Sequence, residues 1–247
     1  MSQRRAELAA RLDTTRARIA AACAAAGRDP AEITLIAVTK TYPASDVLTL
    51  AGLGLTDFGE NRDQEAAPKA AAVSAAGQPV TWHFVGQLQT NKANHVAGYA
   101  DFVHSVDRVR LVRALGAAAR AADRGLTCLV QVNLDPEDED GGTLAAGREQ
   151  QARGGAPPAM VARVAEAIEA EEGLTLGGLM AVAPRGTDPR TAFAPLRKLS
   201  DAVQSVNPSA ALVSAGMSGD LEAAIECGAT HLRIGTALLG DRRLPVR

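Results

Sequence analysis

One lysine and two glycine-containing segments, far apart in the chain, carry residue types that could act together in chemistry. Lys40 ends the apolar run Ile33-Thr-Leu-Ile-Ala-Val-Thr-Lys40, while Ser214-Ala-Gly-Met-Ser-Gly-Asp220 and Arg233-Ile-Gly-Thr236 stand near the other end of the sequence. A lysine amine at the end of a buried strand can form a Schiff base with a carbonyl compound. Glycine-rich turns before helices present backbone N–H groups to a phosphate. The combination predicts a site for a phosphorylated carbonyl compound, and pyridoxal phosphate needs both features.

Each of these segments also has an interpretation without a ligand. A lysine that closes a strand is usually a solvated charge. The turn before the late helix could be held by its own caps, with Ser218 or Asp220 as the capping residue. Alternation in the last strand places Arg233 on the same face as His231 and Gly235, where a carboxylate could pair with it. Only the joint placement of these residues at one end of a sheet favours a ligand site.

Apolar runs that predict strands alternate along the chain with segments that predict helices. Expected strands lie near 33–40, 57–60, 81–86, 102–106, 127–134, 174–182, 211–215 and 231–238. Expected helices lie near 44–52, 61–76, 90–97, 107–123, 158–171, 189–206 and 218–227, after an amphipathic helix near 3–26. This order favours an α/β fold in one domain over residues 1–247, a single (β/α)8 TIM-type barrel with an extra N-terminal helix. An open doubly wound sheet is the competing fold.

A barrel would bring the chemical groups together at one end. Alternation places Ile36, Val38 and Lys40 on one side of the first strand, so Lys40 would emerge at the strand's carboxyl end, where TIM-barrel sites form. Phosphate in such barrels is frequently held by the loops after strands seven and eight, where both late segments fall. Arg233 could then donate to a pyridine nitrogen, which would disfavour protonation of the ring and weaken it as an electron sink.

Composition excludes several other classes of function. The chain is 47% hydrophobic and 22% charged with a formal net charge of −2, so it offers no broad basic field for nucleic acid or acidic membranes. Its three cysteines and four histidines lack the short paired spacing of disulfide frameworks and zinc sites, which leaves metal chemistry without support. No secretory h-region and no apolar run of about 20 residues is present, so we expect a cytoplasmic protein.

One segment interrupts the regular alternation. Acidic, glycine and proline residues accumulate over 135–158, between the fifth strand and its helix. Such a composition predicts a mobile, solvated loop insertion. A cation site or a partner-binding segment is the alternative interpretation of its acidic cluster.

Several ordered motifs together resemble a known family. These are Ala37-Val-Thr-Lys40, Phe58-Gly-Glu-Asn61, Trp82-His-Phe-Val-Gly-Gln-Leu-Gln-Thr-Asn-Lys92, His104-Ser-Val-Asp107, Gly178-Leu-Met180 and the two late segments. Their order resembles the pyridoxal phosphate homeostasis protein (YggS-like) family, which is related to the N-terminal barrel of alanine racemase. The resemblance runs from about Ile33 to Gly240, with the N-terminal helix included more loosely.

The resemblance implies a cofactor, a set of site residues and a role. It implies pyridoxal 5'-phosphate held as an aldimine on Lys40, with Arg233 facing the pyridine ring, Asn61 near the cofactor and His83 as a neighbour. It places the phosphate among Ser214, Met217, Ser218, Gly235 and Thr236. It further implies a non-catalytic, monomeric protein that serves vitamin B6 homeostasis and passes the cofactor to pyridoxal phosphate-dependent apoenzymes.

Two departures from the family pattern and two alternative functions remain open. Arg62 and Asp63 stand where the family often has an aromatic residue after Gly-Glu-Asn, and Ala215 replaces a methionine in the turn after strand seven. A racemase or decarboxylase would need acid and base groups on both faces of the cofactor and usually a second domain or subunit. A cofactor-free aldolase would use Lys40 directly on a sugar phosphate.

Overall fold

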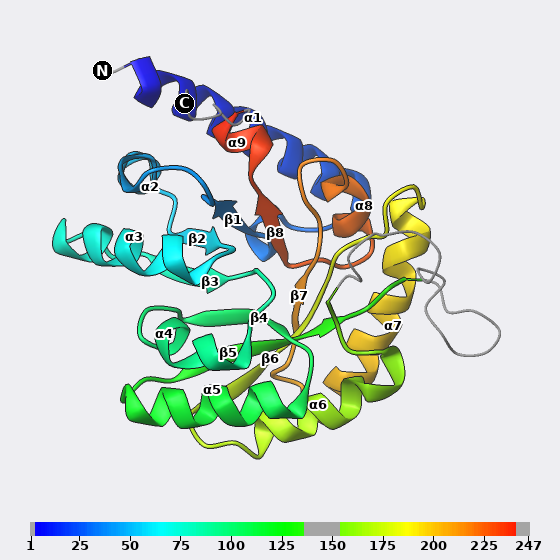
Figure 1. The fold of residues 1–247 in the computed structure, drawn as a ribbon. Coiled ribbons are helices and arrows are strands. Elements are labelled where there is room, and N and C mark those ends of the chain that lie inside the picture. The colour runs from blue at the N-terminus through cyan, green and yellow to red at the C-terminus, as the bar shows by residue number, and fades with distance from the viewer. Residues whose placement is uncertain (1–2, 136–153, 241–247) are drawn as a thin grey trace.

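The structure, a computed structural model, describes residues 3–135 and 154–240. Eight parallel strands close into a barrel in which each strand pairs with its neighbours in sequence and β8 pairs with β1 (Figure 1). The strands are β1 (Thr34–Val38), β2 (Asp57–Glu60), β3 (Thr81–Phe84), β4 (Phe102–Val106), β5 (Leu126–Val132), β6 (Leu174–Ala181), β7 (Leu212–Ser214) and β8 (His231–Ile234). The predicted (β/α)8 barrel is confirmed, and the open doubly wound sheet is wrong.

Helices connect the strands and cover the outside of the barrel. They are α1 (Gln3–Ala26), α2 (Ala44–Ala51), α3 (Asp63–Ala75), α4 (Ala93–Ala97), α5 (Val109–Ala121), α6 (Val161–Glu169), α7 (Pro189–Val206), α8 (Leu221–Glu226) and α9 (Thr236–Leu239). Short 3-10 turns occupy η1 (Pro30–Glu32), η2 (Thr90–Lys92) and η3 (Pro158–Met160). The extra N-terminal helix α1 runs alongside α8 and α9 (Figure 1), which extends the barrel's outer layer over the segments that follow β7 and β8.

The two faces of each strand have different partners. Outward residues such as Ala37 and Phe58 belong to the apolar core between the strands and the helices. Inward residues line the barrel axis, where a Cβ added at Gly59 would lie 3.1 Å from Ile36 and 3.3 Å from Val38. Alternation of the strand side chains therefore separates an apolar outer core from the barrel interior.

Several element boundaries differ from those expected. The strand expected at 231–238 ends at Ile234, because the chain turns at Gly235 and forms the short helix α9. The helix expected from 218 begins at Leu221 instead, because Met217–Asp220 is a turn in which the Met217 N–H donates to the Asp220 carboxylate. The helix expected at 90–97 is divided between η2 and α4, and β1 stops at Val38, two residues before Lys40.

The expected mobile insertion at 135–158 falls largely outside the described residues, which resume at 154. Its described end is anchored rather than loose. The Ala156 N–H donates to the Gln131 carbonyl at 2.7 Å, and the Asn133 N–H donates to the Ala156 carbonyl at 2.9 Å. Ala156 is also 1% exposed, so this end of the segment extends the sheet beside β5.

One motif glycine is required by the backbone itself. Gly178 has a φ of 143°, and a Cβ there would lie 2.0 Å from the Leu212 carbonyl oxygen on β7. It also stands at the register shift where β6 meets β5. Any other residue would force β6 and β7 apart, which explains this glycine without a ligand.

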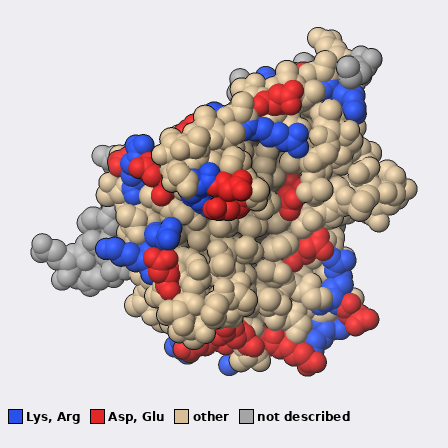
Figure 2. All heavy atoms as spheres, turned by 180° about the vertical axis from the view of Figure 1, so that it is seen from behind, with Lys and Arg blue, Asp and Glu red and all other residues tan. Residues whose placement is uncertain are grey.

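The surface and the cysteines agree with the composition. Figure 2 shows a face on which basic and acidic side chains are intermixed rather than gathered by sign. The three cysteines are free, with Cys23 and Cys128 buried. Within the described ranges no group of three or more His, Cys, Asp or Glu residues is placed to hold a metal ion. In the same part of the chain, no helix combines the length and the hydropathy that crossing a bilayer requires.

Candidate functional site

The predicted site residues meet at the carboxyl ends of the strands. Lys40 follows β1 and Asn61 follows β2, while Ser218 lies in the turn after β7 and Gly235 directly follows β8. β1 separates β2 from β8 in the closed sheet, so these loops are neighbours around one rim. A Cβ added at Gly235 would lie 3.5 Å from the carbonyl oxygen of Val38, the last residue of β1. The barrel thus joins the two distant parts of the sequence beside Lys40.

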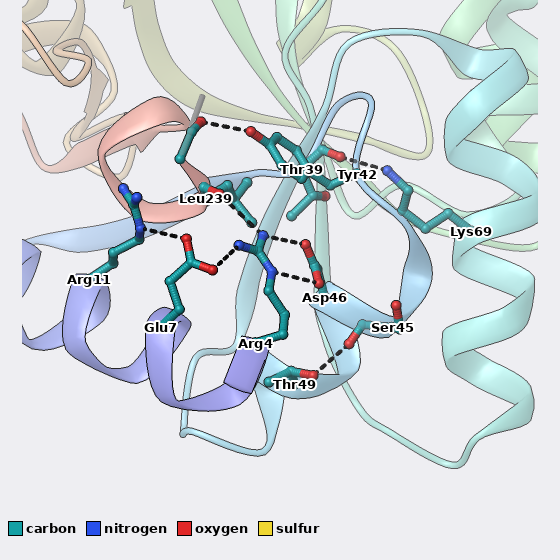
Figure 3. Close-up of polar contacts among 11 residues, drawn as sticks. Arg4, Glu7, Arg11, Thr39, Tyr42, Ser45, Asp46, Thr49, Lys69 and Leu239 are labelled. Carbon is teal, nitrogen blue, oxygen red and sulfur yellow. Dashed lines mark hydrogen bonds and ion pairs between the residues drawn. The ribbon is translucent and has the colours of Figure 1, made fainter. Parts of the chain in front are cut away.

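A buried ion pair holds the backbone just before Lys40. The Lys69 ammonium on α3 donates to Glu60 Oε1 at 2.5 Å and to the Thr39 carbonyl at 2.8 Å (Figure 3 shows the Thr39 contact). The Thr39 hydroxyl donates to the same Glu60 oxygen at 2.6 Å. Burial raises the pKa of Glu60, while Lys69 and Thr39 act in the opposite direction. Because both the carbonyl and the hydroxyl of Thr39 form hydrogen bonds, the backbone directly before Lys40 is held in a fixed position.

The other side of Lys40 is held by the following loop and by α1. Thr41 has a φ of 70° and its N–H donates to the Glu65 carboxylate at 3.0 Å. The Tyr42 hydroxyl donates to the Gly240 carbonyl at 2.7 Å, which ties the loop after β1 to the end of α9 (Figure 3). The Arg4 guanidinium lies over the Tyr42 ring. These contacts hold the loop that follows Lys40 between elements from both ends of the sequence.

Arg4 and its neighbours form the outer support of this rim. Arg4 donates to both carboxylate oxygens of Asp46 at 3.2 and 2.6 Å and to the Leu239 carbonyl at 3.2 Å. Glu7 accepts from Arg4 at 3.1 Å and from Arg11 at 3.2 Å, so the ion pairs continue along α1 (Figure 3). The N-terminal helix therefore fixes the loops that follow β1 and β8 relative to each other.

The two late segments are linked directly. The Ala237 N–H at the start of α9 donates to the Ser218 hydroxyl at 3.2 Å, and the Arg233 N–H donates to the Gly216 carbonyl at 2.9 Å. Arg18 on α1 holds the same turn, because its guanidinium donates to the Ser218 carbonyl at 2.9 Å and pairs with Glu222. The segments form one compact surface of backbone and hydroxyl groups, with the Met217 side chain exposed.

Gly216 makes this turn possible. Its φ is 90°, and a Cβ there would lie 2.6 Å from the Ala224 methyl group and 2.9 Å from Leu232. Only glycine allows both the left-handed backbone and this approach to α8 and β8.

Arg233 is a buried cation whose hydrogen-bond partners among the described residues are neutral. Its guanidinium donates to Ser214 Oγ at 2.6 Å and to the Ala181 carbonyl at 2.8 Å, and both acceptors are neutral. Within the described part of the chain no carboxylate forms an ion pair with it, so the pairing considered from the sequence is wrong for these residues. Burial lowers the pKa of Arg233 to about 10, and Asp220 opposes this only through a longer-range attraction. A buried guanidinium is costly unless an anion pairs with it, and the side-chain hydrogen bonds of Arg233 to described residues reach only neutral oxygens.

Three of the predicted residues, Ser214, His83 and Arg233, are buried inside the barrel rather than exposed on its rim. The Ser214 hydroxyl contacts Arg233 and His104, while the His83 ring contacts His104 and Asp57. Sequence reasoning did not assign His104 or Asp57 to the site. The signal that could have found them is their alternation parity, which puts them on the inward faces of β4 and β2.

Asn61 and the insertion both lie near the loop that follows β3. A Cβ added at Gly86 would lie 2.1 Å from the Asn61 carbonyl oxygen, so this glycine lets the two loops pack together. A Cβ at Gly154 would lie 3.1 Å from the Gln87 amide nitrogen, and the Gln131 side chain donates to the Gly154 carbonyl. The described end of the 135–158 segment therefore lies at the same end of the barrel as Lys40.

The histidines of the barrel interior predict a loss of stability in acid. Burial lowers the pKa of His231 to about 4 and that of His104 well below its ordinary value, so both are neutral in the folded protein near pH 6. The unfolded chain binds protons at these groups from about pH 6.5 downward. Stability is fully present above that pH and falls toward pH 4, by about 3 kcal/mol for His231 alone.

Urea unfolding at pH 7.5 and pH 4.5 measures this effect. Protonation of Glu60, whose pKa is raised, acts in the opposite direction, so the informative quantity is the difference between the wild type and His231→Asn. The variant should lose less stability on acidification than the wild type. Equal pH dependence in the wild type and His231→Asn would contradict the assignment.

Comparison with known proteins places the fold and the sequence in one family. Residues 11–243 match the family described as alanine racemase, N-terminal domain. The pyridoxal phosphate homeostasis protein of Mycobacterium tuberculosis is 42% identical over 98% of this chain and 95% of its own length. Its Escherichia coli counterpart is 36% identical over 96% and 97%.

Solved structures agree with this placement. PipY of Synechococcus elongatus, in a structure with pyridoxal phosphate bound, superposes with a TM-score of 0.77 at 31% identity over 94% of this chain and all of that one. Alanine racemase of Streptomyces lavendulae has a TM-score of 0.66 at 19% identity and is covered over 58% of its length, which shows a shared fold alone. The sequence resemblance is thus confirmed, and this chain belongs to the pyridoxal phosphate homeostasis protein family.

Proposed function

We propose that this protein binds pyridoxal 5'-phosphate through Lys40 and serves vitamin B6 homeostasis as a cofactor carrier. The observation that supports this most directly is Arg233, a buried guanidinium that forms no ion pair with a carboxylate among residues 3–135 and 154–240. The bound cofactor of PipY, a family member of the same length class, supports the same ligand. We propose further that residues 1–247 act as one monomeric domain in the cytoplasm and that pyridoxal phosphate-dependent apoenzymes receive the cofactor.

The residues of the rim fit such a ligand group by group. Lys40 supplies an amine that can join the cofactor's aldehyde through a C=N bond, with loss of one water molecule. Ser218, Gly235 and Thr236 present hydroxyl and backbone N–H groups suited to a phosphate, and Met217 adds an apolar contact. Arg233 offers N–H donors to a ring nitrogen, and Asn61 lies on the same rim, directly after β2. Ser214 and His83 act from inside the barrel, through contacts with other side chains.

Arg233 supports a carrier over an enzyme. A guanidinium that donates to the ring nitrogen disfavours protonation of that nitrogen, and an unprotonated ring is a poor electron sink for carbanions. Racemase and decarboxylase chemistry both depend on that sink. The same residue would suit stable storage of the cofactor, because it adds a charge-assisted hydrogen bond without promoting reaction.

The test is to add pyridoxal phosphate to the purified protein, record the absorbance spectrum, reduce with borohydride and locate the adduct by peptide mass spectrometry. A visible-edge absorbance band and a reduced adduct on Lys40 are the expected results. An adduct together with racemase or decarboxylase turnover would show that the protein is an enzyme rather than a carrier. Absence of any adduct would reject the proposal in favour of the cofactor-free aldolase.

Arg233→Gln should weaken cofactor retention about tenfold or more, or shift its absorbance band, while leaving the fold intact. Glutamine keeps a donor near Ser214 but removes the cation, whose burial is itself unfavourable. Equilibrium dialysis with absorbance measures retention, and urea unfolding measures stability. Arg124→Gln, at an exposed arginine, is the matched control. A large stability loss with an unchanged spectrum would show that Arg233 is purely structural.

A further inference from the structure

A continuous chain of hydrogen bonds crosses the barrel interior. Asp57 Oδ1 lies 2.9 Å from His83 Nε2, and His83 Nδ1 lies 2.9 Å from His104 Nε2. His104 Nδ1 lies 2.9 Å from Ser214 Oγ, which accepts from Arg233 at 2.6 Å. The five side chains come from β2, β3, β4, β7 and β8, so only barrel closure brings them into line. We call this set the interior chain.

The interior chain is shielded from water along most of its length. His83, His104, Ser214 and Arg233 are each at most 4% exposed, whereas the Asp57 side chain is 20% exposed. The Phe102 ring stacks on His83 with centroids 4.5 Å apart. TIM-barrel interiors are usually filled by branched aliphatic side chains, so a fully connected polar path here is an unusual use of the core.

The two ends of the interior chain fix the direction of its hydrogen bonds. Although burial opposes it, hydrogen bonds from His83 and Thr56 lower the pKa of Asp57, which is therefore ionised and can only accept. Arg233 at the other end can only donate. With neutral histidines, every step then has one donor and one acceptor. His83 donates through Nε2 to Asp57, His104 donates through Nε2 to His83, and the Ser214 hydroxyl donates to His104 Nδ1.

If the hydrogen bonds ran in the reverse direction, the observed contacts would leave one donor without an acceptor. If His83 carried a second proton, His104 would have to donate to Ser214 from Nδ1. Ser214 Oγ would then accept from both His104 and Arg233, and its own hydroxyl proton would have no acceptor among the described contacts. Burial is the largest cause that lowers the pKa of His104, and the titratable and charged groups that face it, His83, Arg233 and His231, lower it further. All of these favour the neutral, one-directional arrangement.

We propose that Asp57, His83 and His104 are positioning residues that act through Ser214 to orient Arg233 toward the cofactor ring. The cofactor part of this inference rests on the proposed function. Because the Ser214 proton is committed to His104, Ser214 serves Arg233 and is not a donor to the phosphate, which falls to Ser218, Gly235 and Thr236. Asp57 accepts at the partly exposed end of the interior chain and Arg233 donates at the buried end, so each side chain between them has a hydrogen-bond partner on both sides.

Side-chain ¹⁵N NMR of the ligand-free protein tests the interior chain without any cofactor. His83 and His104 should both appear as neutral Nε2–H tautomers, with Nδ1 unprotonated. Asp57→Ala removes the terminal acceptor, so the hydrogen bonds of the interior chain no longer have a fixed direction. The ¹⁵N signals of His104 should then change. The exposed His95 supplies the internal reference. A protonated His104 Nδ1 in the wild type would overturn the assigned direction.

Cofactor binding then tests whether the interior chain acts through Arg233. His104→Leu should weaken pyridoxal phosphate retention about tenfold or more and move the absorbance band as Arg233→Gln does, while borohydride still labels Lys40. The double variant should be no weaker than Arg233→Gln alone, because both changes remove the same contact. Additive losses would overturn the positioning role. His95→Leu is the control.

Two further measurements distinguish an unfolded variant from a failure of the proposed function or of the positioning role. Circular dichroism and urea unfolding establish that each variant is folded, and if His104→Leu is not, Ser214→Ala breaks the same link with a smaller change. If the wild type fails to trap pyridoxal phosphate, the proposed function is wrong while the NMR result still stands. If the wild type traps it and both link variants bind normally, the positioning role is wrong.

Discussion

Lys40→Ala should abolish borohydride-stable attachment of pyridoxal phosphate while leaving residual, non-covalent binding. In the proposed function the Lys40 amine forms the covalent link, and alanine offers no nucleophile. The phosphate contacts proposed for the turns after β7 and β8 do not involve Lys40, so part of the affinity should remain. Absorbance after dialysis measures retention, and intact-protein mass spectrometry after reduction measures attachment.

The matched control for this variant is Lys198→Ala, at an exposed lysine on α7. It removes one amine far from the rim and should be labelled to the same extent as the wild type. An adduct that persists on another lysine in Lys40→Ala would show that the chemistry lies elsewhere. Complete loss of non-covalent binding would instead show that the phosphate turns contribute little affinity by themselves.

Lys69→Met should lower the free energy of unfolding by about 3–5 kcal/mol, because it leaves the buried Glu60 carboxylate without its cation. One Glu60 oxygen, Oε2, already lacks a hydrogen-bond partner among the described residues, so little remains to compensate the charge. The Thr39 carbonyl loses its donor as well. Urea unfolding at pH 7.5 measures the loss, and part of it should be recovered at lower pH as Glu60 protonates.

Two controls separate the buried pair from a general effect of removing charge. Arg197→Met breaks an exposed ion pair with Asp201 and should change stability by about 0.5 kcal/mol or less. The double variant Lys69→Met with Glu60→Leu should be closer to the wild type than Lys69→Met alone, since no unpaired charge is left. A small loss in Lys69→Met would contradict the role of the pair. Slower trapping of pyridoxal phosphate in the variant would connect the pair to Lys40.

The strand order and the position of the rim follow from patterns that are local in sequence. Apolar runs of strand length alternate with helical periodicity, and this pattern favours a closed parallel barrel over an open doubly wound sheet. Because parallel strands end at one edge, the placement of Lys40, Asn61 and the late segments after their strands predicted a shared rim. The ends of β8 and α8 were predicted wrongly, because a turn closed by the Asp220 side chain and a short helix after Gly235 leave no periodic signal.

Lys69 shows what sequence could not reveal about burial. In a helix of mixed composition a lysine has the appearance of a solvent-facing residue, yet Lys69 is 8% exposed beneath Thr39. Its burial depends on the Glu60 carboxylate nine residues earlier on another element. The same holds for Arg233, because which of the described residues surround it in space decides that its hydrogen-bond acceptors are neutral.

By itself, the sequence determined the fold class, the lysine at the end of the first strand and the glycines that permit the two late turns, because each depends on local composition and periodicity. Tertiary structure alone decided that Ser214 and His83 lie inside the barrel and that Asp57, His83, His104 and Ser214 join in one path to Arg233. The physical reason is that hydrogen bonds between side chains on five strands depend on register and barrel closure. Distances of this kind are set by the assembled sheet and leave no periodic trace in any one strand.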